Sequence, residues 1–301
     1  MRRDVTFESE GATMDGWFYV PDSNPPWPVV VMAHGFSATR RMVADRYAEA
    51  IVEAGPAVLL YDHRGFGESG GEPRRQINPW IQARGYRDAI SFVTTLEGVD
   101  PERIALWGDS LSGGVALCVA AVDDRVAALV VQVPSIGSQP PPDDPDDTRY
   151  ESLAETLRSG DVDPDADEVE GPMPVVSDDQ ERRPSALKPE TAYRWFTGYG
   201  TRRDAGWVNE VTRARPETSV SWHPGLCARH VSCPSLFLVA PDDEMPGSAP
   251  VVARDAYDRL AGPKEWIEIP GGHFGLLYHP GETFDRVASA QTRFLVEQLS
   301  P

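Results

Sequence analysis

The stretch Ile104-Ala-Leu-Trp-Gly-Asp-Ser-Leu-Ser-Gly-Gly114 decides the fold of this chain. Its apolar start predicts a buried strand, and the almost wholly apolar residues 113–122 predict a buried helix. Between the two, a very tight turn presents Ser110 and is flanked by the small residues Gly108 and Ser112. A nucleophile on such a strained turn needs small neighbours, because the strand and the helix nearly touch. The helix N-terminus also directs free N–H groups to where an oxyanion would develop.

Outward from this stretch, short apolar runs alternate with amphipathic segments. That pattern predicts an α/β fold, a mostly parallel sheet with helices on both faces. One helix is expected to begin with Asn78 as its cap and Pro79 as its first residue. Residues 5–7 and 17–20, joined across residues 11–16, predict an antiparallel hairpin on the sheet edge. The runs expected to form the other strands are residues 28–33, 57–61, 104–107, 126–133, 235–240 and 265–269.

The alternation stops in the middle of the chain, which predicts a cap inserted over the sheet at residues 138–230. Residues 143–170 hold twelve acidic side chains against two arginines, so we expect the front of this cap to be acidic and partly irregular. The rest of the insertion is rich in aromatic residues and is expected to be helical. The flanking residues, 1–137 and 231–301, form the predicted core domain.

The composition is that of a globular protein with a strong negative charge. Of the 301 residues, 41% are hydrophobic and 25% charged, and the net charge is −19. Because phosphate binding needs concentrated positive charge, we expect neither nucleic acid nor an anionic membrane surface as a partner. The N-terminal sequence lacks a signal-peptide core, no run approaches a membrane span, and three cysteines are too few for a disulfide framework. These features predict a cytoplasmic protein, and they leave its oligomeric state open.

The turn around Ser110 resembles the G-x-S-x-G nucleophile motif of the α/β-hydrolase family. Ser112 stands in place of the second glycine of the motif, and since serine is small we expect a slightly tighter fit and no loss of function. The resemblance covers residues 1–137 and 231–301 and implies an α/β-hydrolase fold with an inserted cap. The hairpin and the turn look nearest to the dienelactone-hydrolase and Xaa-Pro-peptidase-like branch, which also contains esterases and polyketide acyltransferases. Taken alone, the turn has a second interpretation, a glycine-rich turn with an incidental serine.

A serine hydroxyl is a weak nucleophile until a base removes its proton, and the base needs a third group to hold its tautomer. The resemblance places the base in the loop after the last strand, where His273 lies. It places the acid in the loop after residues 235–240, where the strand end favours Asp243 and leaves Asp242 as the alternative. The histidines show no metal-ligand spacing, so we expect no metal, and the resemblance implies no cofactor.

The resemblance also implies main-chain donors for an oxyanion. His34-Gly-Phe-Ser37 resembles the H-G-x loop of the family, which makes the N–H of Phe36 the partner of the N–H of Leu111. Residues 61–71 resemble the D-x-R-G-x-G-x-S motif of the family. There we expect Asp62 and Arg64 to form an ion pair that fixes loops beneath the site.

These residues predict a serine hydrolase that cleaves a carboxylic ester of a small apolar or aromatic substrate through an acyl-enzyme on Ser110. Ester cleavage is the default because an alkoxide leaves more easily than an amine. Trp195, Phe196 and Trp207 are expected to line the pocket, although each could equally form the core of the cap. An acidic front near the entrance would disfavour polyanionic substrates such as acyl-coenzyme A. The alternatives are amide or peptide cleavage, acyl transfer, and a non-catalytic ligand-binding member of the family.

Overall fold

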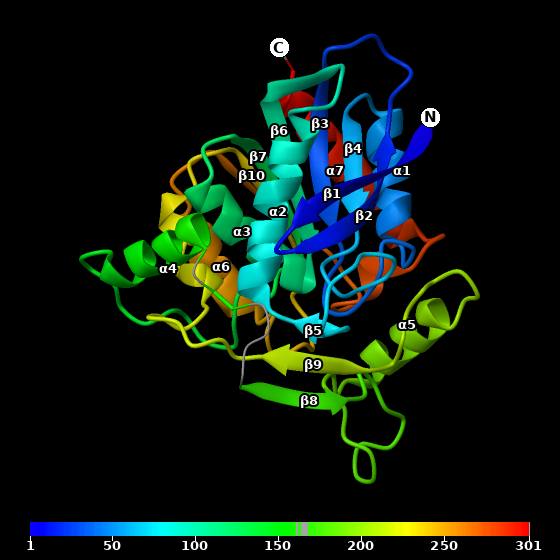
Figure 1. Ribbon diagram of the computed structural model, residues 1–301, viewed down its shortest axis with the longest axis vertical. Coiled ribbons are helices and arrows are strands. Elements are labelled where there is room, and N and C mark those ends of the chain that lie inside the picture. The colour runs from blue at the N-terminus through cyan, green and yellow to red at the C-terminus, as the bar shows by residue number, and fades with distance from the viewer. Residues whose placement is uncertain (161, 164–167, 301) are drawn as a thin grey trace.

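The computed structural model describes residues 1–160, 162–163 and 168–300, and an eight-stranded sheet forms its centre (Figure 1). The strands lie in the order β1-β2-β4-β3-β6-β7-β10-β11. The β1–β2 and β2–β4 pairs are antiparallel, and the remaining pairs are parallel. The strands are β1 (Arg2–Ser9), β2 (Ala12–Tyr19), β3 (Trp27–Ala33), β4 (Ala57–Tyr61), β6 (Val99–Asp109), β7 (Val126–Gln132), β10 (Ser235–Val239) and β11 (Lys264–Glu268).

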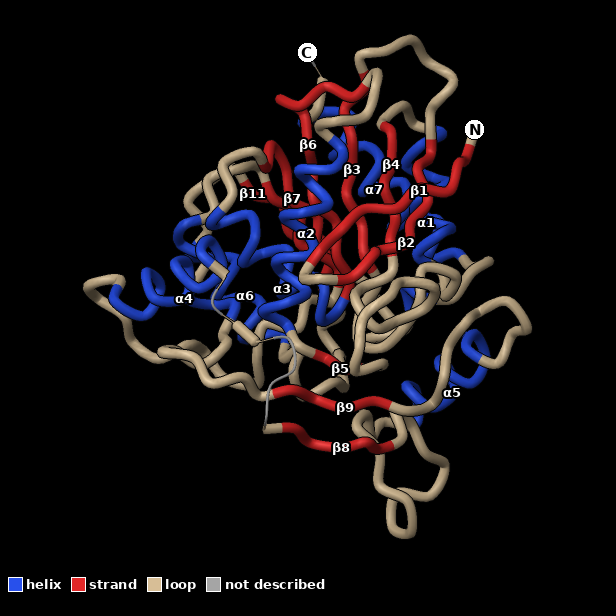
Figure 2. Tube along the Cα trace, in the orientation of Figure 1, coloured by secondary structure: helices blue, strands red, loops and turns tan. Residues whose placement is uncertain are grey.

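The central strands are buried on both faces, because their side chains alternate between two hydrophobic cores. In β3, Val29 and Val31 belong to one core, while Val30 and Met32 belong to the other. Helices α2, α3 and α6 cover the first core, and α1 and α7 cover the second (Figure 2). This arrangement confirms the predicted α/β fold and the hairpin on the sheet edge. The helices are α1 (Ala44–Glu53), α2 (Pro79–Val93), α3 (Ser110–Val122), α6 (Pro250–Arg259) and α7 (Glu282–Gln298).

The segment 138–230 contributes to both cores and to a second sheet. Tyr150 of α4 (Thr148–Ser159) joins the core beneath α2 and α3, and Trp195 of α5 (Glu190–Gly200) joins the core on the opposite face. Strands β8 (Val169–Met173) and β9 (Val211–Ala214) form a three-stranded sheet with β5 (Gln76–Ile77), which comes much earlier in the chain (Figure 1). Two 3₁₀ turns, Pro224–Leu226 and Ala228–His230, complete the segment. Residues 161 and 164–167 of the predicted acidic front lie outside the described residues.

The start of α3 and the turn of the N-terminal hairpin differ from the sequence-based prediction. Helix α3 begins at Ser110 rather than at Gly113, because the chain completes its turn at Ser110 itself. The hairpin turn consists of Glu10 and Gly11 alone, and Gly16 lies within β2. A Cβ atom at Gly16 would stand 3.0 Å from the Cβ of a β4 tyrosine, so this glycine serves close strand packing rather than a turn. Among the described residues, no helix combines the length and the apolar character needed to cross a membrane.

Candidate active site

The turn between β6 and α3 holds Ser110 in a strained conformation. Its φ is 51°, in the left-handed region that residues other than glycine seldom adopt. A Cβ atom at Gly108 would lie 2.3 Å from the main-chain oxygen of Ser112, and one at Gly114 would lie 2.2 Å from the main-chain oxygen of Ser135. Glycine at position 108 therefore lets β6 and α3 approach one another, and glycine at position 114 lets the loop after β7 approach α3. The strained turn that the sequence predicts is present.

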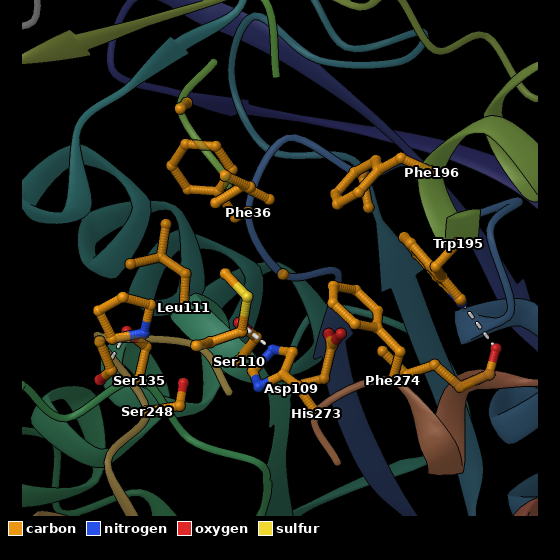
Figure 3. Close-up of a pocket in the computed structure, with 18 of the residues that line it drawn as sticks. Phe36, Asp109, Ser110, Leu111, Ser135, Trp195, Phe196, Ser248, His273 and Phe274 are labelled. Atoms are coloured by element: carbon orange, nitrogen blue, oxygen red, sulfur yellow. Dashed lines mark hydrogen bonds between the residues drawn. The ribbon is translucent and has the colours of Figure 1, made fainter. Parts of the chain in front are cut away.

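Ser110, His273 and Asp243 form a continuous hydrogen-bonded chain. The Ser110 Oγ lies 2.9 Å from His273 Nε2 (Figure 3). On the other side of the ring, His273 Nδ1 lies 2.7 Å from an Asp243 carboxylate oxygen. Since a carboxylate only accepts, Nδ1 carries the imidazole proton and Nε2 is free to accept the proton of the serine. The side chains of His273 and Asp243 are 2% and 0% exposed, so water does not compete for these bonds.

The structure distinguishes between the two adjacent aspartates. Asp243 contacts the imidazole, whereas Asp242 accepts a hydrogen bond of 3.2 Å from the main-chain N–H of Gly272. The N–H of His273 donates to the carboxylate of Glu244 over 2.9 Å. Three consecutive acidic residues of one loop thus hold the histidine loop, and the middle carboxylate of Asp242, Asp243 and Glu244 is the one that reaches the ring.

The loop after β3 approaches Ser110 closely. A Cβ atom at Gly35 would lie 3.0 Å from the main-chain oxygen of Asp109 and 3.1 Å from the Cβ of Ser110. Phe36, the next residue, and Leu111, the residue after the serine, both line the same cavity. The two main-chain segments that the sequence predicts as oxyanion donors therefore lie on either side of Ser110.

Behind this loop, three buried polar side chains form a network in which the proton positions follow from the acceptors. Ser112 donates its hydroxyl proton to the carbonyl of His34, and therefore His63 Nε2–H donates to Ser112 Oγ over 2.8 Å. His34 Nδ1–H donates to the carbonyl of Gly35 over 2.9 Å, while its Nε2 faces the main-chain N–H of His63 at 3.4 Å. Burial lowers the pKa of His34 and lowers the pKa of His63 further, which keeps both rings neutral.

The structure gives Asp62 a partner other than the Arg64 expected from the sequence. Its carboxylate lies 2.6 Å from a guanidinium nitrogen of Arg40, a fully buried side chain that also contacts Asp15 and Glu68. Arg40 lies in the loop after β3, the same loop that carries Phe36. Arg40, which is part of no sequence motif, thus holds together the loops beneath the site.

A cavity of about 470 Å³ opens over Ser110 and His273. Trp195, Phe196 and Phe274 line one part of it, and Ser135 and Ser248 line another (Figure 3). Trp195 is fixed by a hydrogen bond of 2.8 Å from its indole N–H to the carbonyl of Leu277, a residue of the 3₁₀ turn Gly275–Leu277. The site thus combines a nucleophile, a base and a largely apolar enclosure.

Trp207, which the sequence places in the pocket, does not line the cavity. It packs against Phe196 with ring centroids 5.5 Å apart, and a Cβ atom at Gly200 would lie 2.3 Å from its indole. Trp207 therefore supports α5 from behind. Trp195 and Phe196, in contrast, line the cavity.

Sequence reasoning missed several cavity residues. Asp109 is one of them, and burial raises the pKa of its carboxyl to about 7, partly offset by the charge of His273. Among the described residues, its Oδ1 atom has no hydrogen-bond partner. Ser135, Ser248 and Phe274 also line the cavity. Of these, only Asp109 and Phe274 carried a signal in the sequence, since each adjoins a residue of the predicted triad.

The cavity offers no evident site for a metal. Within residues 1–160, 162–163 and 168–300, no group of three or more His, Cys, Asp or Glu side chains is arranged to hold one. What the arrangement can do by itself is transfer a proton from a hydroxyl to an imidazole beside an enclosed space, which is the requirement for acyl transfer to serine.

Comparison with known proteins gives full-length relatives. Residues 28–280 match the alpha/beta hydrolase fold family. Quorum-quenching protein AidA from Acinetobacter baumannii (strain MDR-ZJ06) is 29% identical to this chain. The match covers 97% of this chain and 93% of the AidA sequence. Thiohydrolase aneE from Aspergillus aculeatus is 30% identical, and the match covers 97% of this chain and 91% of the aneE sequence. The crystal structure of the alpha/beta hydrolase GrgF from Penicillium sp. sh18 covers 100% of both chains with 25% identity and a TM-score of 0.75. The chain described here belongs to the alpha/beta hydrolase fold family.

Proposed function

We propose that this protein is a serine hydrolase that cleaves a carboxylic ester through an acyl-enzyme on Ser110. The observation that carries the proposal is the hydrogen-bonded chain from the Ser110 hydroxyl through His273 to Asp243. Each of the three groups has the neighbour that its chemical role requires, and the serine opens onto a cavity of about 470 Å³.

The reaction follows from the proton positions. His273 Nε2 takes the hydroxyl proton as the Ser110 Oγ attacks the acyl carbon, and Asp243 stabilises the imidazolium that forms. The N–H groups of Phe36 and Leu111 hold the oxyanion of the tetrahedral intermediate. His273 then gives its proton to the departing alkoxide, which leaves as an alcohol. A water molecule, deprotonated by the same histidine, attacks the acyl-enzyme, and the carboxylic acid is released as the proton returns to Ser110.

The segment 138–230 acts in this proposal as a cap that shapes the substrate pocket. Leu187, Lys188, Trp195, Phe196 and Arg213 of this segment line the cavity, opposite the residues that carry the reaction. The aromatic side chains favour an apolar or aromatic substrate. Lys188 and Arg213 also bring positive charge to the cavity wall, which weakens the expectation that acidic residues of the cap repel anionic substrates.

Thioesters are a second substrate class for the same chemistry. The observation that favours them is the relative named a thiohydrolase, which matches this chain over almost its whole length. A thiolate leaves from the same tetrahedral intermediate as an alkoxide, so the roles of Ser110 and His273 do not change. Transfer of the acyl group to an acceptor other than water would require that acceptor to enter the same cavity.

The test is a burst assay with short and medium p-nitrophenyl esters and thioesters of matched chain length. We expect wild-type turnover, its abolition in Ser110→Ala, and wild-type turnover in the control Ser289→Ala, which changes an exposed serine of α7. Labelling of wild type, but not of Ser110→Ala, by a fluorophosphonate probe identifies the nucleophile. Turnover that persists in Ser110→Ala contradicts the proposal, and a folded wild type that neither turns over nor labels points to a non-catalytic ligand-binding protein.

A further inference from the structure

The cavity has two chemically different parts on either side of Ser110. On one side stand Trp195, Phe196 and Phe274, which we call the aromatic side. On the other side stand Ser135 and Ser248 beside Leu111, which we call the hydroxyl side (Figure 3). The proposed function needs a scissile carbonyl at Ser110, and a substrate held there extends into both parts.

Ser248 has a hydroxyl group that the protein leaves unused. The residue is 4% exposed. Its main chain is held at two points: its N–H donates to the carbonyl of Met245 over 2.9 Å, and it forms an isolated parallel β-bridge with Gly137. Within the part of the chain that the structure describes, the Ser248 Oγ has no hydrogen-bond partner. Figure 3 shows this hydroxyl directed into the cavity. A hydroxyl that opens into a cavity and has no protein partner is free to form a hydrogen bond with a ligand or water there.

Ser135 presents the complementary hydrogen-bonding character. Its hydroxyl donates its only proton to the carbonyl of Gly247 over 3.1 Å, so towards the cavity it can only accept. This bond depends on the glycine, because a Cβ atom at Gly247 would lie 2.7 Å from the Ser135 Oγ. Ser248, in contrast, can donate as well as accept.

One acceptor beside one free donor is the pattern that a neutral hydroxyl group satisfies. A ligand hydroxyl can donate to Ser135 and accept from Ser248, whereas an alkyl group would leave Ser248 unpaired and a carboxylate could not donate to Ser135. The three side chains that define the hydroxyl side, Leu111, Ser135 and Ser248, are all uncharged. Their chemistry therefore suits a neutral polar group better than an anion.

We propose that the substrate is an ester with an apolar or aromatic group on one side of the scissile carbonyl and a hydroxyl group on the other, and that Ser248 and Ser135 bind this hydroxyl. The inference rests on the proposed ester cleavage at Ser110 and specifies its substrate class. The hydroxyl belongs either to the acyl half or to the alcohol half of the ester, and the two cases need separate substrates.

The experiment uses two matched pairs of esters. The first pair, p-nitrophenyl 3-hydroxybutyrate and p-nitrophenyl butyrate, places the hydroxyl in the acyl half. The second pair, 2-hydroxyethyl benzoate and propyl benzoate, places it in the alcohol half. For each pair we measure the ratio of kcat/KM for the hydroxylated ester to kcat/KM for the plain ester. Wild type should show a ratio of roughly ten in at least one pair, the size of effect expected of a satisfied hydrogen bond.

Ser248→Ala should bring that ratio close to one, and Ser248→Thr, which keeps the hydroxyl, should retain most of it. The control Ser289→Ala should keep the wild-type ratio. If Ser248→Ala does not fold, as judged by its thermal unfolding, Ser135→Ala tests the same contact from the accepting side and should also lower the ratio.

The outcomes separate this inference from the proposed function. Wild-type ratios near one in both pairs, or a ratio that survives in Ser248→Ala and Ser135→Ala, overturn the hydroxyl site while leaving the hydrolase intact. Turnover that persists in Ser110→Ala, or a wild type that hydrolyses none of the four esters, refutes the proposed ester hydrolase and this inference with it. The pair that responds assigns the hydroxyl to the acyl or the alcohol half.

Discussion

The hydroxyl of Ser112 donates a hydrogen bond to the main-chain carbonyl of His34, and so joins the first turn of α3 to the loop after β3. His34 in turn holds the carbonyl of Gly35 through its Nδ1–H. Because a peptide unit is planar, fixing the Gly35 carbonyl also fixes the direction of the Phe36 N–H. The serine in place of the second motif glycine thus belongs to the support of a proposed oxyanion donor, beyond the tighter fit that the sequence suggests.

Replacing Ser112 with glycine restores the family motif and removes this support. We expect kcat for a p-nitrophenyl ester to fall about tenfold with little change in KM, less than the 10²- to 10³-fold typical when a donor itself is lost. Ser112→Ala should behave in the same way, since it also lacks the hydroxyl. Wild-type kcat in both variants would mean that position 112 requires only a small side chain.

The carboxyl of Asp109 makes a pH-dependent contribution to stability. Burial raises its pKa to about 7 from the ordinary value of 3.8, so the folded state keeps the proton that the unfolded chain releases. The folded state therefore loses stability as pH rises from about 4 to about 7, and by the linkage relation this loss reaches about 3 kcal/mol between pH 5 and pH 8.

Asp109→Asn removes this titration. In urea unfolding, the difference in the free energy of unfolding between the variant and wild type should shift in favour of the variant by about 3 kcal/mol from pH 5 to pH 8. Asp124→Asn, which changes an exposed carboxylate at the end of α3, serves as the control and should show no such shift. A pH-independent difference for Asp109→Asn would mean that its carboxyl titrates normally.

The two adjacent aspartates should differ sharply in their effect on catalysis. Asp243→Asn puts an amide against His273 Nδ1 and favours the wrong tautomer, so we expect kcat to fall about 10⁴-fold, as in other serine triads. Asp242→Asn affects only a bond to the Gly272 N–H and should retain most of the activity. Single-turnover acylation rates compare the two directly, and a larger loss in the Asp242 variant would reverse the assignment.

Substitutions of Trp195 and Trp207 should have different effects, because Trp195 lines the cavity and Trp207 packs behind it against Phe196. Trp195→Ala removes a wall of the cavity and should raise KM for an aromatic or long-chain ester about tenfold, with a smaller effect on an acetyl ester. The Trp207 side chain packs behind Phe196, away from the cavity. Trp207→Ala should therefore lower the unfolding temperature and leave the preference between the two esters unchanged. Equal changes in preference for both variants would contradict this distinction.

The sequence predicts those parts of the site that depend on local order along the chain. The strained turn at Ser110 is visible because Gly108 and its neighbours must be small, and the glycines before His273 mark the loop that brings it near. The pairing of Asp62 with Arg40 could not be predicted, because each partner lies in a different loop and the pair forms only when β3 and β4 lie side by side.

The orientations of the Ser248 and Trp207 side chains could not be predicted from the sequence either. A serine in a loop and a tryptophan after a helix have no local signature of facing a cavity or facing away from it. Their orientation is set by the loops and helices that pack around them, such as Gly200, whose missing side chain admits the Trp207 indole. Residue type and spacing predict which groups can react, and tertiary packing decides what surrounds them.

The pairing of β5 with β9 has a mechanical consequence. Gln76 and Ile77 lie directly before α2, so the segment 138–230 is attached to the sheet domain by more than its two chain ends. The hydroxyl of Thr39 adds an attachment through the carbonyl of Ala205 at 2.6 Å, and the Trp195 indole adds another through Leu277. Because these contacts lie at separated points, the segment 138–230 could not rotate as one unit about a hinge without breaking at least one of them. Access to the cavity should therefore depend on small side-chain adjustments rather than on a hinge movement of the segment 138–230.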